Sequence, residues 1–434
     1  MRRDFRVVAC EVWKPAYLHG ATRRERWVPW NVFSCVQQIA WTRVLAWRVV
    51  LLPALLLLAV LPLTACGRDS AGGDTSSTSS STLATVTATS PSAPLDAARP
   101  LLAIRDAGSW RAEGVDDIEV WICHVPADST VALYFGLPLR LPLTASGVVA
   151  ILNTRVTPYF ATISHGQYQP QFRAGGEATL AIDQGPEICV DQAIVGADDT
   201  TDAVLVVADA EHRPEQPGGF GSGGVPCPAE PPCSVLDSRR SAYIGASDFH
   251  PDWADQPPMD LVEHELGHTL GWTHSGFVSG AAQPYQSAID LMSNSAAPRD
   301  VDAARRDGPD TLAINRLFAG WLPESDVWVA PAAGGTVQLQ PSTGATGTRL
   351  ALIALADGNY LTVEVLSADG FNAHLPTGGV TVHRVLLAEG AVQTIVPLVG
   401  TAPFIDLLQP GEFVDSDGWR IAVLVGGVSV TPIS

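Results

Sequence analysis

The sequence predicts an α+β fold, in which a region of mixed helices and strands is followed by an all-β region. Up to about residue 322, apolar runs with helical spacing alternate with runs typical of strands. Beyond it, short apolar runs are separated by Gly, Pro and Asp, a pattern typical of a β-sandwich. We therefore divide the folded part of the chain into residues 99–322 and 323–434.

The first of these ranges contains most of the recognisable elements. The expected elements are, in order, a strand at 118–125, a helix at 143–163, strands at 169–173 and 178–182, a helix beginning in 190–194, and strands at 203–208 and 241–247. The run 203–208 is apolar throughout, so we expect it to be buried. Residues 214–232 are rich in Pro and Gly and predict a surface loop.

One stretch of eleven residues, His-Glu-Leu-Gly-His-Thr-Leu-Gly-Trp-Thr-His, carries the strongest functional signal. Positions four apart lie on one face of a helix, so His264 and His268 can present their imidazoles to one cation. Gly271 allows a sharp backbone turn, which can bring His274 back as a third ligand. Three histidines that leave one position open are typical of a catalytic zinc site. Glu265 can take a proton from metal-bound water.

Together with Met292 downstream, this stretch resembles the metzincin superfamily of zinc endopeptidases, whose pattern is HExxHxxGxxH followed by a methionine turn. The resemblance implies that Met292 forms an apolar floor under the site, although a gap-filling core methionine would be buried in nearly the same way. Asn294 stands where some metzincins have a tyrosine near the metal, so no tyrosine ligand is expected from that position. If strand 241–247 is the antiparallel edge that precedes the zinc helix in metzincins, a peptide could pair with it.

Three later segments resemble the immune-inhibitor-A-like and gametolysin-like metzincins in particular. They are residues 311–322, 360–364 and 375–383. The first resembles the helix and Gly-Trp-Leu segment after the methionine turn, and the other two resemble strands of that group's C-terminal β region. The role of this region stays open between a substrate-binding module and a stabilising cap.

An apolar run at residues 49–65 ends at Cys66, and its Leu-Thr-Ala-Cys end resembles a bacterial lipobox, in which the cysteine is acylated. The run contains two prolines and is short for a hydrocarbon core about 30 Å thick. We therefore expect residues 1–66 to be the signal region of an exported lipoprotein on the cell surface, with a retained transmembrane helix as the alternative. Residues 1–43 are long for a segment that precedes a signal, so we expect translation to begin later.

Residues 67–98 are rich in Ser, Thr, Ala and Gly, which predicts a flexible tether to the membrane. The chain has 26 Lys plus Arg against 45 Asp plus Glu, a net charge of −19. Such an acidic balance argues against nucleic-acid binding. The expected partners are a protein or peptide substrate and, through the lipid anchor, a membrane; nothing indicates the oligomeric state.

Four cysteines follow Cys66, and an even number in an exported chain predicts two disulfides. Three connectivities are possible. We favour a long-range pair between Cys123 and Cys189 and a short loop between Cys227 and Cys233.

Two acidic runs are candidates for calcium, which extracellular proteases often bind. They are Asp198, Asp199 and Asp202, and Asp415 and Asp417. Neither has the spacing of an EF-hand, so solvated loops are the alternative.

The resemblance implies a metzincin-type domain, with a twisted mixed sheet and long helices around a zinc cleft. It also implies a zinc-dependent endopeptidase in which Glu265 is the general base. A zinc amidase acting on cell-wall peptide would use the same site on a different amide. A catalytically silent surface adhesin would use the β region instead, but the intact Glu265 and all three histidines argue against it.

Overall fold

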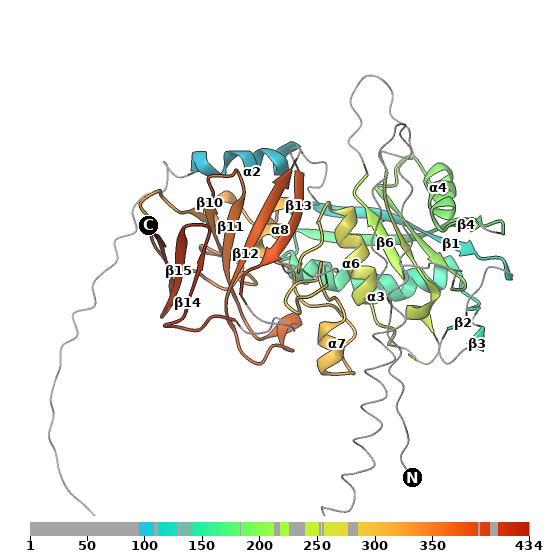
Figure 1. Cartoon of the computed structure of the whole chain (residues 1–434). Coiled ribbons are helices and arrows are strands. Elements are labelled where there is room, and N and C mark those ends of the chain that lie inside the picture. The colour runs from blue at the N-terminus through green and yellow to red at the C-terminus, as the bar shows by residue number, and fades with distance from the viewer. Residues whose placement is uncertain are drawn as a thin grey trace, which may run out of the picture. The chain divides into compact units, whose positions relative to one another are not determined.

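The computed structural model describes the chain in the following ranges: 95–107, 112–127, 132–133, 137–138, 140–182, 184–211, 218–224, 239–250, 253, 256–276, 285–388, 391–399 and 407–433. The expected signal region with Cys66, and the Cys227–Cys233 pair, lie outside these ranges. The described residues all belong to one compact unit (Figure 1). None of the helices in the described ranges combines the length and the apolarity that crossing a bilayer requires.

A five-stranded sheet with the order β4-β1-β5-β7-β6 forms the first half of this unit. Its strands are β1 (Gly114–His124), β4 (Tyr168–Thr179), β5 (Ala203–Ala208), β6 (Gly219–Ser222) and β7 (Arg240–Ile244). The first four in spatial order are parallel, and β6 runs antiparallel to β7. The predicted apolar strand 203–208 is confirmed with all six residues buried. The single strand β4 covers the strand expected at 169–173 but only the first two residues of the one expected at 178–182.

The edge of this sheet differs from the expectation. The strand expected at 241–247 was a candidate antiparallel edge, but β7 is internal and pairs in parallel with β5. The antiparallel edge is β6, which lies inside the predicted surface loop 214–232. Its sequence, Gly-Phe-Gly-Ser, has a single apolar side chain and therefore shows no strand alternation.

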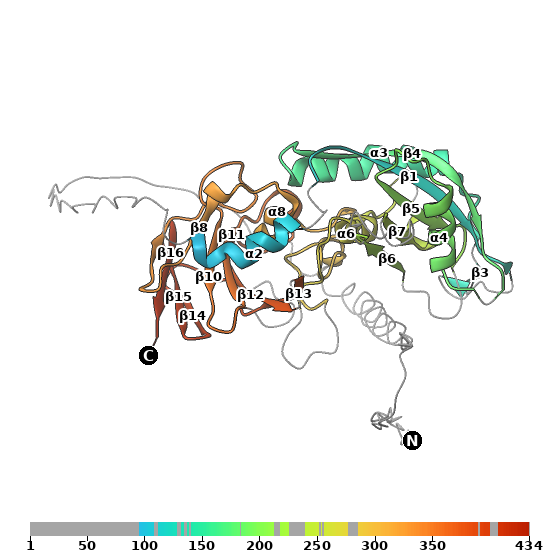
Figure 2. The same cartoon turned by 90° about the horizontal axis from the view of Figure 1, so that it is seen from above.

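Helices cover both faces of the sheet (Figure 2). On one face, α3 (Ala145–Ile163) packs against alternate residues of β1, and α6 (Asp260–Thr269) packs against β6 and β7. The helix predicted at 143–163 is thus confirmed as α3, which begins after Thr144, whose hydroxyl accepts the Gly147 N–H at 3.2 Å. On the other face lies α4 (Glu187–Gly196), joined to β1 by a disulfide between Cys123 and Cys189. This pairing was predicted.

Two further sheets follow in the second half. The first, with the order β13-β12-β11-β10-β8, contains β8 (Val327–Val329), β10 (Leu350–Ala354), β11 (Tyr360–Leu366), β12 (Gly379–Ala388) and β13 (Ala391–Pro397). The second, β14-β15-β16-β9, contains β9 (Gly335–Val337), β14 (Phe413–Ser416), β15 (Trp419–Leu424) and β16 (Gly427–Pro432). Apolar side chains from both sheets form one shared core.

The remaining elements are short, apart from one helix. They are α2 (Leu95–Ala107), α7 (Ala297–Val301), α8 (Ala313–Ala319), the two-stranded ladder β2 (Ala132–Leu133) with β3 (Leu137–Pro138), and the 3-10 turns η2 (Ala246–Phe249), η4 (Glu324–Asp326) and η5 (Gly370–Asn372).

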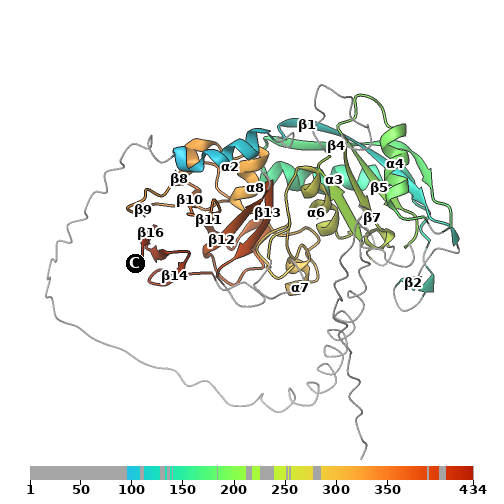
Figure 3. The same cartoon turned by 45° about the horizontal axis from the view of Figure 1, so that its top comes forward.

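Helices α2 and α8 pack on the first of the C-terminal sheets, although both come before residue 323 (Figure 3). Leu101 of α2, Leu317 of α8 and Leu352 of β10 are fully buried in one core. At the start of α8, the Ala313 N–H donates to the Glu364 carboxylate of β11 at 3.0 Å. Helix α8 is therefore anchored in the sheet that follows it in the chain.

Candidate metal centre

The three predicted ligand histidines converge at the end of α6. His264 and His268 lie one turn apart on the helix. Gly271 then adopts a φ of 78°, a left-handed conformation that strains other residues, and the chain turns back to place His274 beside them. The candidate ligand atoms of all three lie within 4.8 Å of one another.

The hydrogen bonds of two rings determine which nitrogen faces the centre. His264 Nδ1 lies 2.7 Å from the Leu291 carbonyl oxygen, and His268 Nδ1 lies 2.7 Å from that of Trp272. A carbonyl oxygen can only accept, so each Nδ1 carries the proton. A neutral imidazole then has its lone pair on Nε2, the atom that a metal requires.

The environment keeps these rings neutral. Burial, followed by the neighbouring His268 and His274, holds the pKa of His264 well below its usual value. Burial also lowers the pKa of His268, and burial with His268 lowers the pKa of His274 to about 3. Neutral imidazole is the ligand form, so the trio needs no proton loss to bind a cation near pH 7.

The donor set fits zinc. His268 Nε2 and His274 Nε2 are 3.0 Å apart, so these two nitrogens need a shared proton or a cation between them. Two nitrogen ligands at about 2.0–2.1 Å from one tetrahedral zinc are themselves about 3.3 Å apart. Three converging neutral nitrogens are also the ligand set of many catalytic zinc sites.

Glu265 lies against the edge strand β6. Its side chain is buried, and burial raises its pKa well above the ordinary value of a carboxyl group. A Cβ built on Gly219 would stand 2.8 Å from Glu265 Cγ and 2.9 Å from Oε1, so only glycine allows this approach. A cation held by the neighbouring histidines would favour the ionised carboxylate and oppose the effect of burial.

Met292 packs directly on the helix that carries the first two histidines. It is fully buried, and a Cβ built on Gly267 would stand 2.5 Å from its sulfur and 2.9 Å from Trp272 Cε3. The Met292 carbonyl oxygen accepts the Ser275 N–H at 2.9 Å, directly after the third histidine. Met292 thus packs on α6 through its side chain and holds the residue after His274 through its backbone.

Tyr285 is a site residue that the sequence reasoning missed. Its hydroxyl lies 3.2 Å from His274 Nε2, and its ring centroid lies 5.1 Å from that of His274 and 6.0 Å from that of His264. Burial and the nearby Glu265 raise its pKa to about 12, which keeps the phenol protonated and able to donate. The sequence signal was the single tyrosine between the third histidine and Met292.

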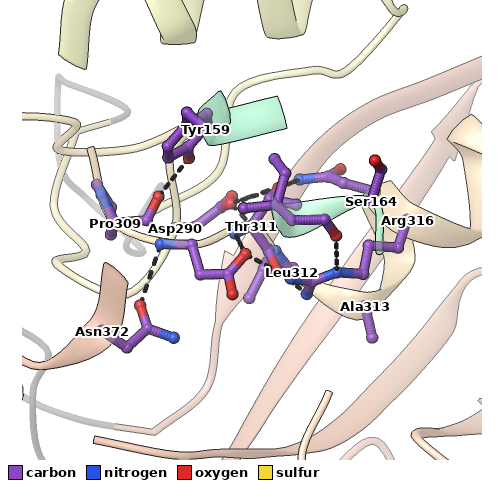
Figure 4. A network of polar contacts seen from close by, with 12 residues as sticks. Tyr159, Ser164, Asp290, Pro309, Thr311, Leu312, Ala313, Arg316 and Asn372 are labelled. Carbon is purple, nitrogen blue, oxygen red and sulfur yellow. Dashed lines mark hydrogen bonds and ion pairs between the residues drawn. The ribbon is translucent and has the colours of Figure 1, made fainter. Parts of the chain in front are cut away.

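A buried polar network surrounds Asp290, two residues before Met292 (Figure 4). The Asp290 carboxylate accepts hydrogen bonds from the Thr311 hydroxyl at 3.1 Å and the Leu312 N–H at 3.3 Å. Its other oxygen accepts from the Ser275 hydroxyl. Arg316 closes the network by donating to the Thr311 carbonyl at 2.6 Å. Asp290 therefore ties the residue after His274 to the start of α8.

Two buried carboxyl groups stand near the other end of α6. Asp260 pairs with Arg299 at 2.9 Å, while the Asp248 Oδ2 has no hydrogen-bond partner among the described residues. Burial and the charge of Asp260 raise the pKa of Asp248 to about 8, with Arg299 opposing and Glu211 adding to the effect. Asp248 therefore keeps its proton in the folded protein at pH values where it loses it in the unfolded chain.

This difference predicts a pH dependence of stability. The carboxyl titrates near 3.9 in an unfolded chain and near 8 when folded, so the folded state binds more protons between these values. The free energy of unfolding should fall as pH rises from about 4 to about 8. Asp248→Asn, which cannot ionise, should remove this part of the slope and stabilise the protein at pH 8. Thermal unfolding midpoints against pH test this; parallel profiles would contradict it.

The calcium expectation is not supported. Asp198 accepts hydrogen bonds from Thr200, Asp202 accepts the Asp117 N–H at 2.8 Å, and Asp415 pairs with Arg420. These three carboxylates therefore bond to protein groups and do not converge on a shared site. Within the described ranges, three or more His, Cys, Asp or Glu side chains lie close enough to share a metal ion at the histidine trio, and not at the acidic runs.

Comparisons with known proteins add little to this description. No protein-family model matches the chain, and no curated protein matches it. Among solved structures, one match is the crystal structure of archaemetzincin from Methanopyrus kandleri, which is 18% identical with a TM-score of 0.25. The match covers 47% of this chain and 95% of that one. A likeness at this level carries no argument about activity, so the functional conclusion rests on the site.

Proposed function

We propose that the chain is a zinc-dependent endopeptidase with a metzincin-type catalytic region. The observation that supports the proposal is the convergence of three neutral imidazoles on the helix–glycine–turn geometry that the motif predicts, with the buried Glu265 next to the first histidine in the same helix. Two imidazole nitrogens as close as those of His268 and His274 need a shared proton or a cation between them, and a zinc ion would meet this need for the whole trio.

The roles of the side chains follow from their positions. A zinc ion bound by the trio would supply a Lewis acid that polarises the substrate carbonyl and lowers the pKa of water to about 7. Glu265 would accept the proton of the attacking water and return it to the leaving amine. Tyr285 would donate a hydrogen bond to the carbonyl oxygen as negative charge develops there.

The edge strand β6 suggests how the substrate is held. It is antiparallel, lies at the edge of its sheet, and contacts α6 beside Glu265. We propose that an extended peptide pairs with its main chain, which aligns the scissile bond without demanding a particular side chain.

Cleavage of an unstructured protein such as casein tests the proposal. We expect activity with one equivalent of zinc, loss with a chelator, and recovery when zinc is restored. A protein that binds zinc but cleaves only cell-wall peptide amides would instead be a zinc amidase. A protein that binds zinc and cleaves neither would contradict the proposed function.

Tyr285→Phe provides a finer test of the site. Loss of the hydroxyl should lower kcat on the order of 10²-fold, because a hydrogen-bond donor to the developing oxyanion is lost. The substrate KM and the zinc content should stay close to those of the wild type, since neither depends on this bond. Steady-state kinetics and metal analysis check both; an unchanged kcat would exclude the role.

We also propose that the protein is exported and held on the cell surface by a lipid on Cys66. The lipobox resemblance supports this, and the Cys123–Cys189 disulfide fits an oxidising compartment. In bacteria supplied with labelled palmitate, the wild-type protein should carry the label and enter the membrane fraction. Cys66→Ser should lose both, whereas an unlabelled wild-type protein would contradict the anchor.

A further inference from the structure

The segment that carries the third histidine is paired with a strand of the C-terminal half. Ser275 and Ile395 of β13 form a parallel bridge. The Ile395 N–H donates to the His274 carbonyl oxygen at 3.4 Å, and the Ile395 carbonyl oxygen accepts the Gly276 N–H at 3.1 Å. The backbone on both sides of Ser275 is thus held by one residue of β13.

Other contacts reinforce this pairing. The Thr273 hydroxyl donates to the Gln393 carbonyl oxygen at 3.1 Å, one residue before His274. On the opposite side, the Met292 carbonyl oxygen accepts the Ser275 N–H. His374, which also belongs to the C-terminal half, lies with its Nε2 2.6 Å from the Ala288 carbonyl oxygen, just before the methionine turn.

The position of β13 explains why it can receive this segment. Among the described residues, it is the edge strand of its sheet and pairs with β12 as its one neighbouring strand. In an antiparallel strand, the N–H and C=O of one residue point to the same side. Both groups of Ile395 bond to the His274–Gly276 segment, so they face away from β12.

The three histidines are therefore restrained in two different ways. Carbonyl oxygens at Nδ1 orient the His264 and His268 rings, which also stand on a helix. His274 lies beyond the Gly271 turn, and the backbone pairing with β13 restrains it.

We infer that β13 is a positioning element of the metal centre: by pairing with residues 273–276 it holds His274 where it can ligate. This inference rests on the proposed zinc site. It gives the C-terminal sheet a role in completing that site, beyond those of a substrate-binding module or a distant cap. Contacts that orient ligands typically change metal affinity by about 10- to 100-fold when they are lost.

Ile395→Pro tests the inference because proline has no N–H to donate to His274. Proline is tolerated on an edge strand where its nitrogen faces away from the neighbouring strand, so the β12–β13 ladder should persist. The Ile395 side chain is buried, and its loss has its own cost. Ile395→Ala is the matched control, because it removes the side chain and keeps the N–H.

A second pair of variants changes no apolar packing. Thr273→Val removes the hydroxyl that donates to Gln393 while keeping the shape of the side chain, and Thr273→Ser retains the donor. The serine variant should therefore behave as the wild type. If Ile395→Pro does not fold, as judged by circular dichroism, the Thr273 pair decides the question.

The readouts are zinc affinity, measured by competition with a chromophoric chelator, and the visible spectrum of the cobalt-substituted protein, which reports ligand geometry. We expect Ile395→Pro to bind zinc about 10- to 100-fold more weakly than Ile395→Ala, and Thr273→Val more weakly than Thr273→Ser, each with an altered cobalt spectrum. Equal affinities and spectra within each pair, in a protein whose wild type binds zinc, would overturn the positioning role. A wild type that binds no zinc would instead refute the proposed function.

Discussion

Glu265→Gln is expected to lower kcat for peptide hydrolysis on the order of 10³-fold while zinc stays bound at one equivalent. Glutamine keeps the size of the side chain beside Gly219 but cannot accept a proton from water. The three imidazoles are untouched, so metal binding should persist. Steady-state kinetics on a quenched fluorescent peptide, with zinc measured in the same sample, give both quantities.

The control for Glu265→Gln is the same substitution at a glutamate outside the site. Glu177, on β4, has a side chain 74% exposed and lies in a different part of the sheet. Glu177→Gln should leave kcat and zinc content at wild-type values. If Glu265→Gln also cleaves at the wild-type rate, another group must be the base and the mechanism is wrong.

Removal of the Cys123–Cys189 disulfide should cause the largest loss of stability. The bond closes a loop with a sequence separation of 66 residues between β1 and α4. In the chain-entropy treatment, a cross-link of this span stabilises the folded state by about 4 kcal/mol, because it restricts the unfolded chain. The Cys123→Ala/Cys189→Ala protein should unfold at a correspondingly lower urea concentration.

Urea unfolding of both proteins without reductant measures this difference, and it leaves any other disulfide of the chain intact. Below the unfolding transition, the variant should keep zinc and peptidase activity, since both cysteines lie in the core on the α4 face, away from the histidines. Equal midpoints would show that the bond adds nothing to stability. Loss of zinc from the folded variant would show that the bond shapes the centre.

The elements that could be predicted are those whose apolar or functional residues repeat with the period of a helix or strand within a short stretch of sequence. The 3.6-residue repeat places His264 and His268 on one face, and Gly271 permits the turn to His274, so the trio follows from eleven consecutive residues. Strand β5 could likewise be predicted from its unbroken apolar run, because every one of its residues is buried.

Elements whose signal is not local were missed. Strand β6 has two glycines, which allow Glu265 and the backbone of α6 to pack closely against the strand. A contact between distant segments of this kind leaves no local sequence pattern. In β4, Gly176 interrupts the strand pattern because Trp121 covers it; a Cβ there would stand 2.6 Å from the indole ring. The role of Tyr285 depends on the path of the chain between His274 and Met292.

The pairing of Thr273 with Gln393, 120 residues further along the chain, has a consequence for biosynthesis. The motif leaves the ribosome long before β13, and non-local contacts of this kind form late. A nascent or truncated chain would therefore present its histidines without the partner strand. Its affinity for zinc should then be lower than that of a chain in which β13 has been made and has paired with residues 273–276.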